Sequence, residues 1–174
     1  LLPFAVENVE TVPVCAEEIL LIAPDIVLEK AYPGRLEEIK AQLSQSTDLR
    51  LLESCPFILL KKGNRVRTIA DEMFEEAQIT PRIVLETENI ETVLALSAKG
   101  MGITFFPRMF MSNDQSTQDH RTKFMERARL NPYPLNFRRA HGVLGIGYHK
   151  GHYMSRATKE FIRIAKERIP YNPD

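Results

Sequence analysis

The sequence has no excess of charge of either sign. Among its 174 residues, 23 Lys and Arg balance 23 Asp and Glu, so the formal net charge is zero. A neutral chain lacks the basic surface that is typical of domains binding nucleic acid or anionic membranes directly. We therefore do not expect direct contacts with DNA or a membrane from this portion.

Long apolar runs are also missing. No run approaches the roughly 20 residues that a membrane-spanning helix requires, and the first residues lack the basic segment of a signal peptide. An apolar fraction of 44% with 26% charged residues is ordinary for a globular domain. The sequence therefore predicts a cytoplasmic protein.

Cysteine is scarce, with only Cys15 and Cys55. Both lie in apolar segments far apart in the sequence, which favours buried thiols in a reducing compartment over a disulfide. His149 and His152 have the spacing H-x-x-H, with His141 nearby, but no Cys or carboxylate clusters with them. We therefore expect no metal site, because zinc in proteins requires three or four ligands.

Catalytic signatures are absent as well. The sequence contains no G-x-S-x-G nucleophile elbow, no phosphate-binding G-x-x-x-x-G-K-[ST] loop and no dinucleotide fingerprint. Cys55 has no histidine nearby in sequence that could activate it as a nucleophile. We therefore expect neither an enzyme nor a bound cofactor.

A strand, helix, strand unit is the clearest feature that is present, from Pro81 to Pro107. Residues 82–86 are apolar and β-branched and predict a buried strand, and an apolar helical stripe begins at Ile90 and stops at Gly100. Residues 103–106 predict a second buried strand. Such βαβ units are parallel, and ligands bind beyond the carboxyl ends of their strands. The predicted site edge comprises Thr87, Glu88, Asn89 and the turn from Phe106 to Pro107, with Asn89 or Thr87 as the helix N-cap.

A second strand and helix precede this unit. Residues 55–60 predict a buried strand, and Asn64 caps a helix whose apolar positions fit the helical period. The linking segment, Lys61 to Arg65, lies at a helix N-terminus and is basic, which is typical of an anion site. A solvated basic turn explains the same residues equally well.

The remaining segments give weaker patterns. Residues 9–14 and 17–23 predict two strands, with Pro13 near a sheet edge because it cannot donate a ladder hydrogen bond. The polar segment 112–122 predicts a loop, and Tyr133, Leu135 and Phe137 alternate as in a strand. Ser155 caps a last helix, whose predicted buried side comprises Ala157, Thr158, Phe161, Ile164, Ala165 and Ile169.

Residues 56–107, PFILLKKGNRVRTIADEMFEEAQITPRIVLETENIETVLALSAKGMGITFFP, resemble the middle of the effector-binding domain of LysR-type transcriptional regulators. The opening LLPF, the segment ILLIAPD, and LGIGYHKGHYMSRATKEFIRIAKE at 144–167 resemble its flanks. The resemblance implies an α/β fold of the two-lobed type 2 periplasmic-binding-protein kind. Lobe I would comprise residues 1–55 and 145–174, without its first strand and helix, and lobe II residues 56–144.

The resemblance also implies a function. A small effector would bind between the lobes, and its binding would be passed to an N-terminal winged helix-turn-helix domain that is not in this sequence and that binds promoter DNA. It implies homodimers or tetramers. The basic segment and the aromatic residues at 105 and 106 suggest an anionic effector such as an aromatic or unsaturated carboxylate. By position, the effector-binding residues are Pro3, Phe4, Lys62, Asn64, Arg65, Thr87, Glu88, Asn89, Phe105, Phe106 and Ile146.

Two alternatives share this fold. A solute-binding protein of a transport system would bind its ligand in the same way, and the residues before Leu1 would distinguish it by a signal peptide. An enzyme would require an acid and base pair in the cleft, where Glu88 is the only obvious carboxylate. A cysteine-based redox sensor is disfavoured, because Cys15 and Cys55 fall in lobe I and at the hinge, outside lobe II.

Overall fold

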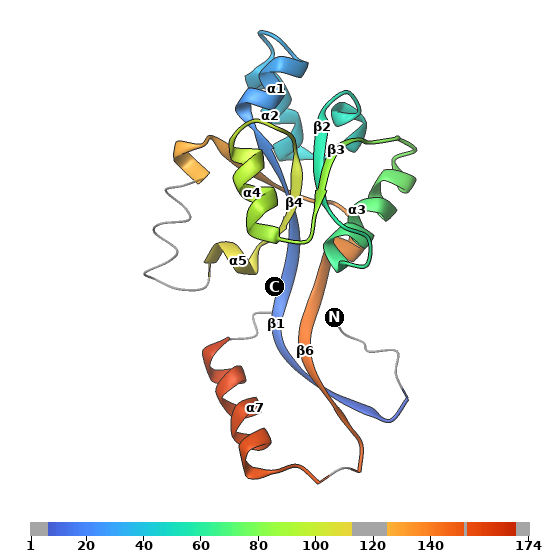
Figure 1. Ribbon diagram of the computed structural model, residues 1–174, viewed down its shortest axis with the longest axis vertical. Helices are drawn as coiled ribbons and strands as arrows, with labels where there is room; N and C mark the ends of the chain where they lie inside the picture. Colours follow the sequence, from blue (N-terminus) through green and yellow to red (C-terminus); the bar gives the residue numbers. More distant parts are fainter. Residues whose placement is uncertain (1–6, 113–124, 152, 170–174) are drawn as a thin grey trace. The chain divides into compact units, whose positions relative to one another are not determined.

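The computed structural model describes residues 7–112, 125–151 and 153–169 (Figure 1). The chain forms two compact units: unit 1 comprises residues 1–18 and 141–174, and unit 2 residues 19–140. The predicted lobe boundary at residue 55 differs from this division, because residues 19–55 pack into the core of unit 2. How the units correspond to the two predicted lobes stays a prediction.

A parallel strand pair forms one side of the sheet in unit 2. Strand β2 (Pro56–Leu60) pairs with β3 (Arg82–Thr87), with Leu60 opposite Thr87. Ile103 joins this pair to the rest of the sheet, since its N–H donates to the Pro56 carbonyl at 2.8 Å and its carbonyl accepts from the Ile58 N–H at 2.9 Å. β2 therefore lies inside the sheet and β3 at its edge.

Antiparallel strands complete the sheet of unit 2. The segment 19–24 of β1 (Val9–Pro24) lies between β4 (Thr104–Pro107) and β5 (Leu130–Pro134) and pairs antiparallel with both. Its side chains at 19–24 are all buried. Residues 9–23 therefore do not form the two separate strands predicted from the sequence, but one continuous strand whose register shifts between Pro13 and Cys15.

Two helices cover opposite sides of this sheet. Helix α3 (Arg65–Glu76) connects β2 to β3, and α4 (Ile90–Ala98) connects β3 to β4 by crossing back over β2. Right-handed crossovers in opposite directions place the two helices on opposite faces, as Figure 1 shows. Of the predicted apolar positions of α3, Val66, Ile69, Ala70, Met73 and Phe74 are buried, and Ala77, the C-cap, is half-buried.

Aromatic side chains fill the core beneath α3. The rings of Phe57 and Phe74 meet edge to face with centroids 5.0 Å apart, and Phe105 stacks on Phe57 at 6.3 Å. Phe106, the next residue of β4, points to the other face and packs against Leu94 of α4. The two faces of the sheet thus bury alternate residues of β4.

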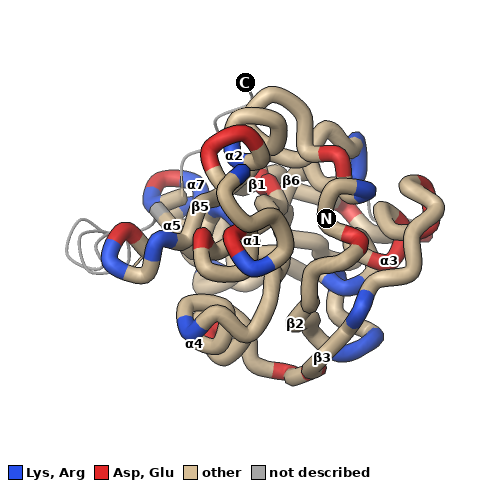
Figure 2. The backbone as a smooth tube through the Cα atoms, turned by 90° about the horizontal axis from the view of Figure 1, so that it is seen from above, with Lys and Arg blue, Asp and Glu red and all other residues tan. Residues whose placement is uncertain are grey.

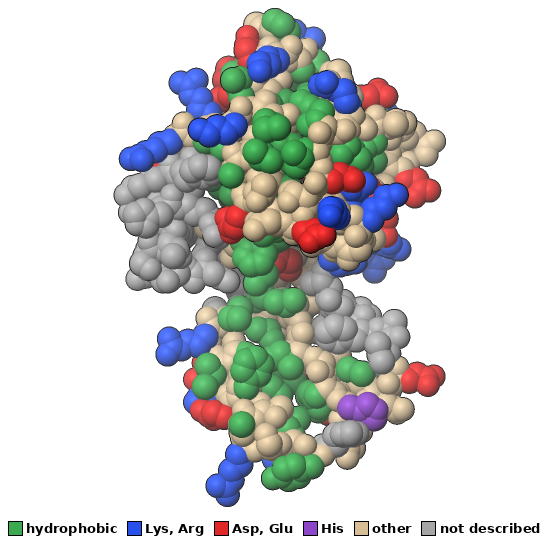
Figure 3. All heavy atoms as spheres, in the orientation of Figure 1, with side chains coloured by type: hydrophobic (Ala, Val, Ile, Leu, Met, Phe, Trp, Pro, Cys, Tyr) green, Lys and Arg blue, Asp and Glu red, His purple; other side chains and the backbone are tan. Residues whose placement is uncertain are grey.

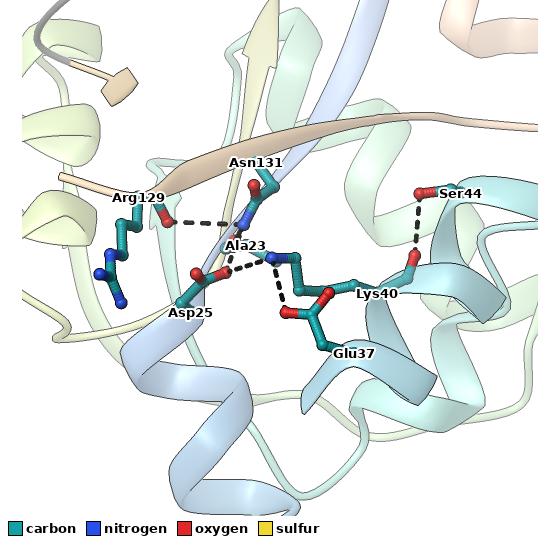
Figure 4. Close-up of polar contacts among 7 residues, drawn as sticks. All are labelled: Ala23, Asp25, Glu37, Lys40, Ser44, Arg129 and Asn131. Carbon is teal, nitrogen blue, oxygen red and sulfur yellow. Dashed lines mark hydrogen bonds and ion pairs between the residues drawn. The ribbon is translucent and has the colours of Figure 1, made fainter. Parts of the chain in front are cut away.

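A polar network joins three elements of unit 2 that the sequence pattern did not connect (Figure 4). Helix α1 (Asp25–Ala31) begins with a carboxylate that accepts from Asn131 Nδ2 of β5 at 2.6 Å. Lys40 of α2 (Leu36–Gln45) lies 3.5 Å from the same carboxylate. The short helices η1 (Leu49–Leu52), α5 (Met109–Ser112) and η2 (Arg138–Ala140) complete the unit.

Unit 1 contains the first half of β1 paired antiparallel with β6 (His141–His149), and helix α7 (Arg156–Arg168). Ser155 caps α7 by accepting from the Thr158 N–H at 3.1 Å, as predicted. The predicted buried side of α7 is wrong, because none of its residues is buried and the Phe161 side chain is 62% exposed. Figure 3 shows apolar side chains at the surface of this unit.

One further prediction fails at β3, which is not a buried strand. Arg82, Ile83 and Val84 are exposed, because β3 pairs with β2 on one side and with no other strand among the described residues. Within the described ranges, no helix is long and apolar enough to cross a membrane.

Candidate functional site

Two helix N-termini adjoin at the carboxyl ends of the parallel strands. β2 ends at Leu60 and β3 at Thr87, which are paired in register, and each strand leads into a helix capped by an asparagine. Asn64 Oδ1 accepts from the Val66 N–H at 2.9 Å, and Asn89 Oδ1 accepts from Glu91 and Thr92 at 2.8 and 3.1 Å. The N-cap is therefore Asn89, and the Thr87 hydroxyl accepts from its N–H at 3.3 Å. We refer to residues 61–65 and 87–89, a candidate binding site, as the effector edge.

Lys61 connects the two loops of the effector edge. Its N–H donates to the Thr87 carbonyl at 2.9 Å, which extends the parallel ladder beyond β2. Its ammonium lies 3.0 Å from the Glu88 carboxylate. Both side chains are exposed, so this pair adds little stability, but it places the one carboxylate of the edge beside a cation. Gly63 permits the tight turn between β2 and α3, since its φ is +94°.

Arg67 is buried next to the effector edge and stabilises it. The side chain is only 4% exposed, and it donates to the Leu60 carbonyl at 3.0 Å, to Asp71 at 2.7 Å and to Glu86. Burial alone would lower the pKa of Arg67, but the hydrogen bonds to Glu86 and Asp71 raise it above its ordinary value. The hydrogen bond from Arg67 in turn lowers the pKa of Glu86. The ends of β2 and β3 are thus held by one buried cation.

The edge is chemically suited to a small anion. Lys62 and Arg65 are exposed, and neither forms an ion pair with another residue in the described part of the chain. Helix N-termini carry a partial positive charge and backbone N–H groups that bind anions. Elsewhere along the chain, basic and acidic segments are interspersed (Figure 2).

Six of the predicted effector-binding residues come together at this edge: Lys62, Asn64, Arg65, Thr87, Glu88 and Asn89. Phe105 and Phe106 do not lie at its surface, because both rings are at most 1% exposed and pack in the core. Ile146 is half-buried on β6 of unit 1, opposite Val12. Pro3 and Phe4 lie outside the described residues. Contacts of all eleven residues with an effector stay predictions.

Sequence reasoning missed Arg67, the buried centre of this arrangement. Arg67 adjoins the apolar stripe of α3, where a long cation is unexpected. The available signal was its spacing to Asp71, since residues four apart on a helix are neighbours. Its partners Leu60 and Glu86 come from two strands, so no local pattern connects them to it.

Both cysteines are free and buried, as the sequence predicted. Burial raises the pKa of the Cys55 thiol to about 11, and that of Cys15 is raised for the same reason. Neither thiol is therefore ionised enough to be a ready nucleophile near neutral pH. Among the residues that the structure describes, no group of three or more His, Cys, Asp or Glu is placed to hold a metal ion.

Comparisons with known proteins agree with this architecture. A family model described as the LysR substrate binding domain matches residues 1–170. The uncharacterized HTH-type transcriptional regulator YybE of Bacillus subtilis (strain 168) is 30% identical over 105 residues, which cover 60% of this chain and 32% of YybE. YcgK of the same organism, described in the same words, is 27% identical over 114 residues, covering 62% of this chain and 35% of YcgK. The matched segment is thus about a third of each regulator.

Solved structures share the fold at low sequence identity. The effector-binding domain of QuiR in complex with shikimate has a TM-score of 0.63 and 20% identity, covering 94% of this chain and 68% of that one. The regulatory domain of CcmR from Synechocystis PCC6803 in complex with 2-PG has a TM-score of 0.68 and 17% identity, covering 97% and 70%.

Proposed function

Because the chain belongs to the LysR substrate binding domain family, we propose that its effector edge binds a small anion and so controls transcription. The effector binds more tightly to the conformation of the domain in which this edge is accessible. The population of that conformation therefore rises when the effector is present. A DNA-binding domain of a longer regulator responds to the shift. No covalent step is required, and action on promoter DNA would place the regulator in the cytoplasm.

One observation carries this proposal: two asparagine-capped helix N-termini adjoin at Leu60 and Thr87, beside the exposed cations Lys62 and Arg65. The relatives support the regulatory part, because YybE and YcgK are described as HTH-type transcriptional regulators. The ligands named with QuiR and CcmR support a small-molecule effector. The comparisons do not favour a transport protein.

A binding screen tests the effector. Shikimate, phosphoglycolate and benzoate would each be titrated into the 174-residue chain, with the midpoint of thermal unfolding as the readout. A ligand present at 100 times its dissociation constant stabilises the folded state by about 2.7 kcal/mol. We expect Lys62→Glu and Arg65→Glu to remove the shift of any anion that binds, because each reverses a charge at the edge.

The matched control is Lys159→Glu on α7, which reverses an exposed charge in unit 1. It should leave the thermal shift intact. If the edge variants bind an anion as well as the parent chain does, the proposed site is wrong.

The regulatory role has a separate test, since it depends on more than this domain. The complete reading frame should encode a helix-turn-helix domain, and the full regulator should form a homodimer or tetramer that binds promoter DNA. An effector found in the screen should change that DNA affinity. An unchanged affinity would argue against the regulatory proposal while leaving the binding site in place.

A further inference from the structure

A cavity lies in unit 2 at the opposite end of the parallel strands from the effector edge. It has a volume of about 630 Å³, and its walls come from η1, the carboxyl end of α3 and the segment at 136–137. η1 precedes β2 and Ile79 precedes β3, so the cavity lies at the amino ends of these strands. The length of the strands separates it from the effector edge by about 15 Å.

The lining of this cavity mixes apolar and polar side chains. Leu49, Met73, Ile79 and Phe137 line it, and the first three are nearly fully buried within unit 2. Its volume falls in the range of roughly 300–1,000 Å³ that is usual for small-molecule sites. Its apolar part would contact an aromatic or aliphatic body of modest size, beside polar groups of Thr47, Gln78 and Asn136.

The charged residues at the rim favour a cation. Arg50 is engaged by Asp48, to which it donates from Nε at 3.0 Å and from Nη2 at 2.8 Å, and this interaction lowers the pKa of Asp48. The other two ionisable lining residues are Glu53 and Glu76, and neither forms an ion pair with any residue in the described ranges. The rim therefore presents two available carboxylates and no available cation.

The end of helix α3 adds to this preference. Glu76 is the last residue of the helix and Ala77 its C-cap, and both line the cavity. The carboxyl end of a helix carries a partial negative charge, which stabilises a cation nearby. The turn beyond it is well defined, because Gln78 adopts a φ of +55° and the Ile79 N–H donates to the Phe74 carbonyl at 3.1 Å.

We propose that this cavity is a second ligand site, which binds a small primary amine carrying an apolar body. The ammonium lies between Glu53 and Glu76 at the carboxyl end of α3, and the body contacts Met73 and Phe137. The site lies at the other end of the strands and prefers the opposite charge, so the two sites can be occupied at the same time. The regulator would then respond to two chemically different small molecules.

Three ligands that share an aromatic ring and differ in charge test the proposal. Benzylamine, benzyl alcohol and benzoate would be titrated into the 174-residue chain while the amide signals of Gln78 and Ile79 and the methyl signal of Met73 are followed by NMR. We expect saturable shifts with benzylamine, weaker ones with benzyl alcohol and none there with benzoate. Shifts at Asn64 and Asn89 report the effector edge separately, so the outcome at one site does not depend on the other.

Variants identify the groups responsible. Glu53→Gln and Glu76→Gln should each weaken benzylamine binding by about two- to fivefold, which corresponds to an exposed ion pair. Ala77→Leu should place a larger side chain in the cavity and weaken binding. Glu75→Gln is the matched control, since Glu75 adjoins Glu76 on α3 but does not line the cavity, and it should bind as the parent chain does.

The following results would contradict the proposal. Absence of saturable shifts with benzylamine would overturn the site. Equal shifts with benzoate, or unchanged affinity in both Glu→Gln variants, would overturn the cation preference and with it the proposal.

Discussion

The guanidinium of Arg67 donates a 3.0 Å hydrogen bond to the carbonyl of Leu60, the last residue of β2. The same guanidinium binds Glu86 on β3 and Asp71 one turn along α3. One buried side chain therefore holds the helix and both parallel strands where the effector edge begins. This relationship ties the ends of β2 and β3, where the exposed effector edge begins, to the folded core.

Replacing Arg67 by Met should destabilise unit 2. The substitution leaves the Leu60 carbonyl without its side-chain donor, and an unsatisfied buried acceptor costs about 1–3 kcal/mol. Urea unfolding measures the loss. Arg65→Met is the control, because Arg65 is exposed on the same helix and should change stability by less than about 0.5 kcal/mol. Equal stabilities of the two variants would contradict the role of Arg67.

Acidification should remove part of this stability. The hydrogen bond from Arg67 lowers the folded-state pKa of Glu86, so its contribution is present above the unfolded-state value of about 4.3 and is lost as pH falls through the lowered value. The difference in stability between the parent chain and Glu86→Gln should therefore shrink below about pH 4. In an Arg67→Met background the same difference should not change with pH. A pH-independent difference in the parent chain would rule out this linkage.

Asn89→Asp separates helix capping from charge. Asp caps a helix about as well as Asn does, so the unfolding free energy should change by less than about 0.5 kcal/mol. The added negative charge should weaken binding of an anionic effector, as calorimetry would show. Asn89→Ala makes the opposite comparison, because loss of the cap costs about 1 kcal/mol. An effector that binds Asn89→Asp unchanged does not contact this helix end.

Two glycines should be sensitive for different reasons. A Cβ at Gly102 would lie 2.7 Å from the Pro56 carbonyl oxygen, which accepts from Ile103, so Gly102→Ala should cost about 1–3 kcal/mol through overpacking. Gly34 has open space but a φ of +74°. Gly34→Ala should cost about 1 kcal/mol, and Gly34→Asn less, because Asn tolerates this conformation. Thermal unfolding of the three variants checks both explanations.

Periodicity predicted the elements that carry a strong local pattern. The apolar positions of α3 and the βαβ order from β3 to β4 are as the sequence indicated, and Asn64 and Asn89 are the caps. Capping and helical period are properties of consecutive residues, so they can be read without the fold. For this reason most of the effector edge could be predicted.

Exposure could not be predicted in the same way. The apolar run of β3 resembles that of β2, yet Ile83 and Val84 are exposed while Ile58 and Leu59 are buried. The difference arises because β2 has neighbours on both sides and β3 has one among the described strands. The order of strands in a sheet depends on segments that are far apart in the sequence. An apolar run alone therefore does not determine whether its side chains are buried.

The cavity at the amino ends of β2 and β3 could not be predicted from the sequence for a related reason. Leu49, Met73 and Phe137 come from three segments, and none has an unusual local context. Helix α1 was missed because its seven residues span only two turns, too few to show a period. The sequence predicts separate strands at 9–14 and 17–23, and the structure joins them in β1, whose register shifts between Pro13 and Cys15.

The two reciprocal hydrogen bonds of Ile103 have a consequence for cooperativity. They connect the parallel pair to the antiparallel strands of unit 2, so a local opening of one part exposes backbone groups of the other. Hydrogen exchange at the Ile58 and Ile103 amides should therefore be slow and should proceed only through unfolding of the whole unit. A binding event at either end of these strands would then protect the entire sheet from exchange, and not merely the residues that touch the ligand.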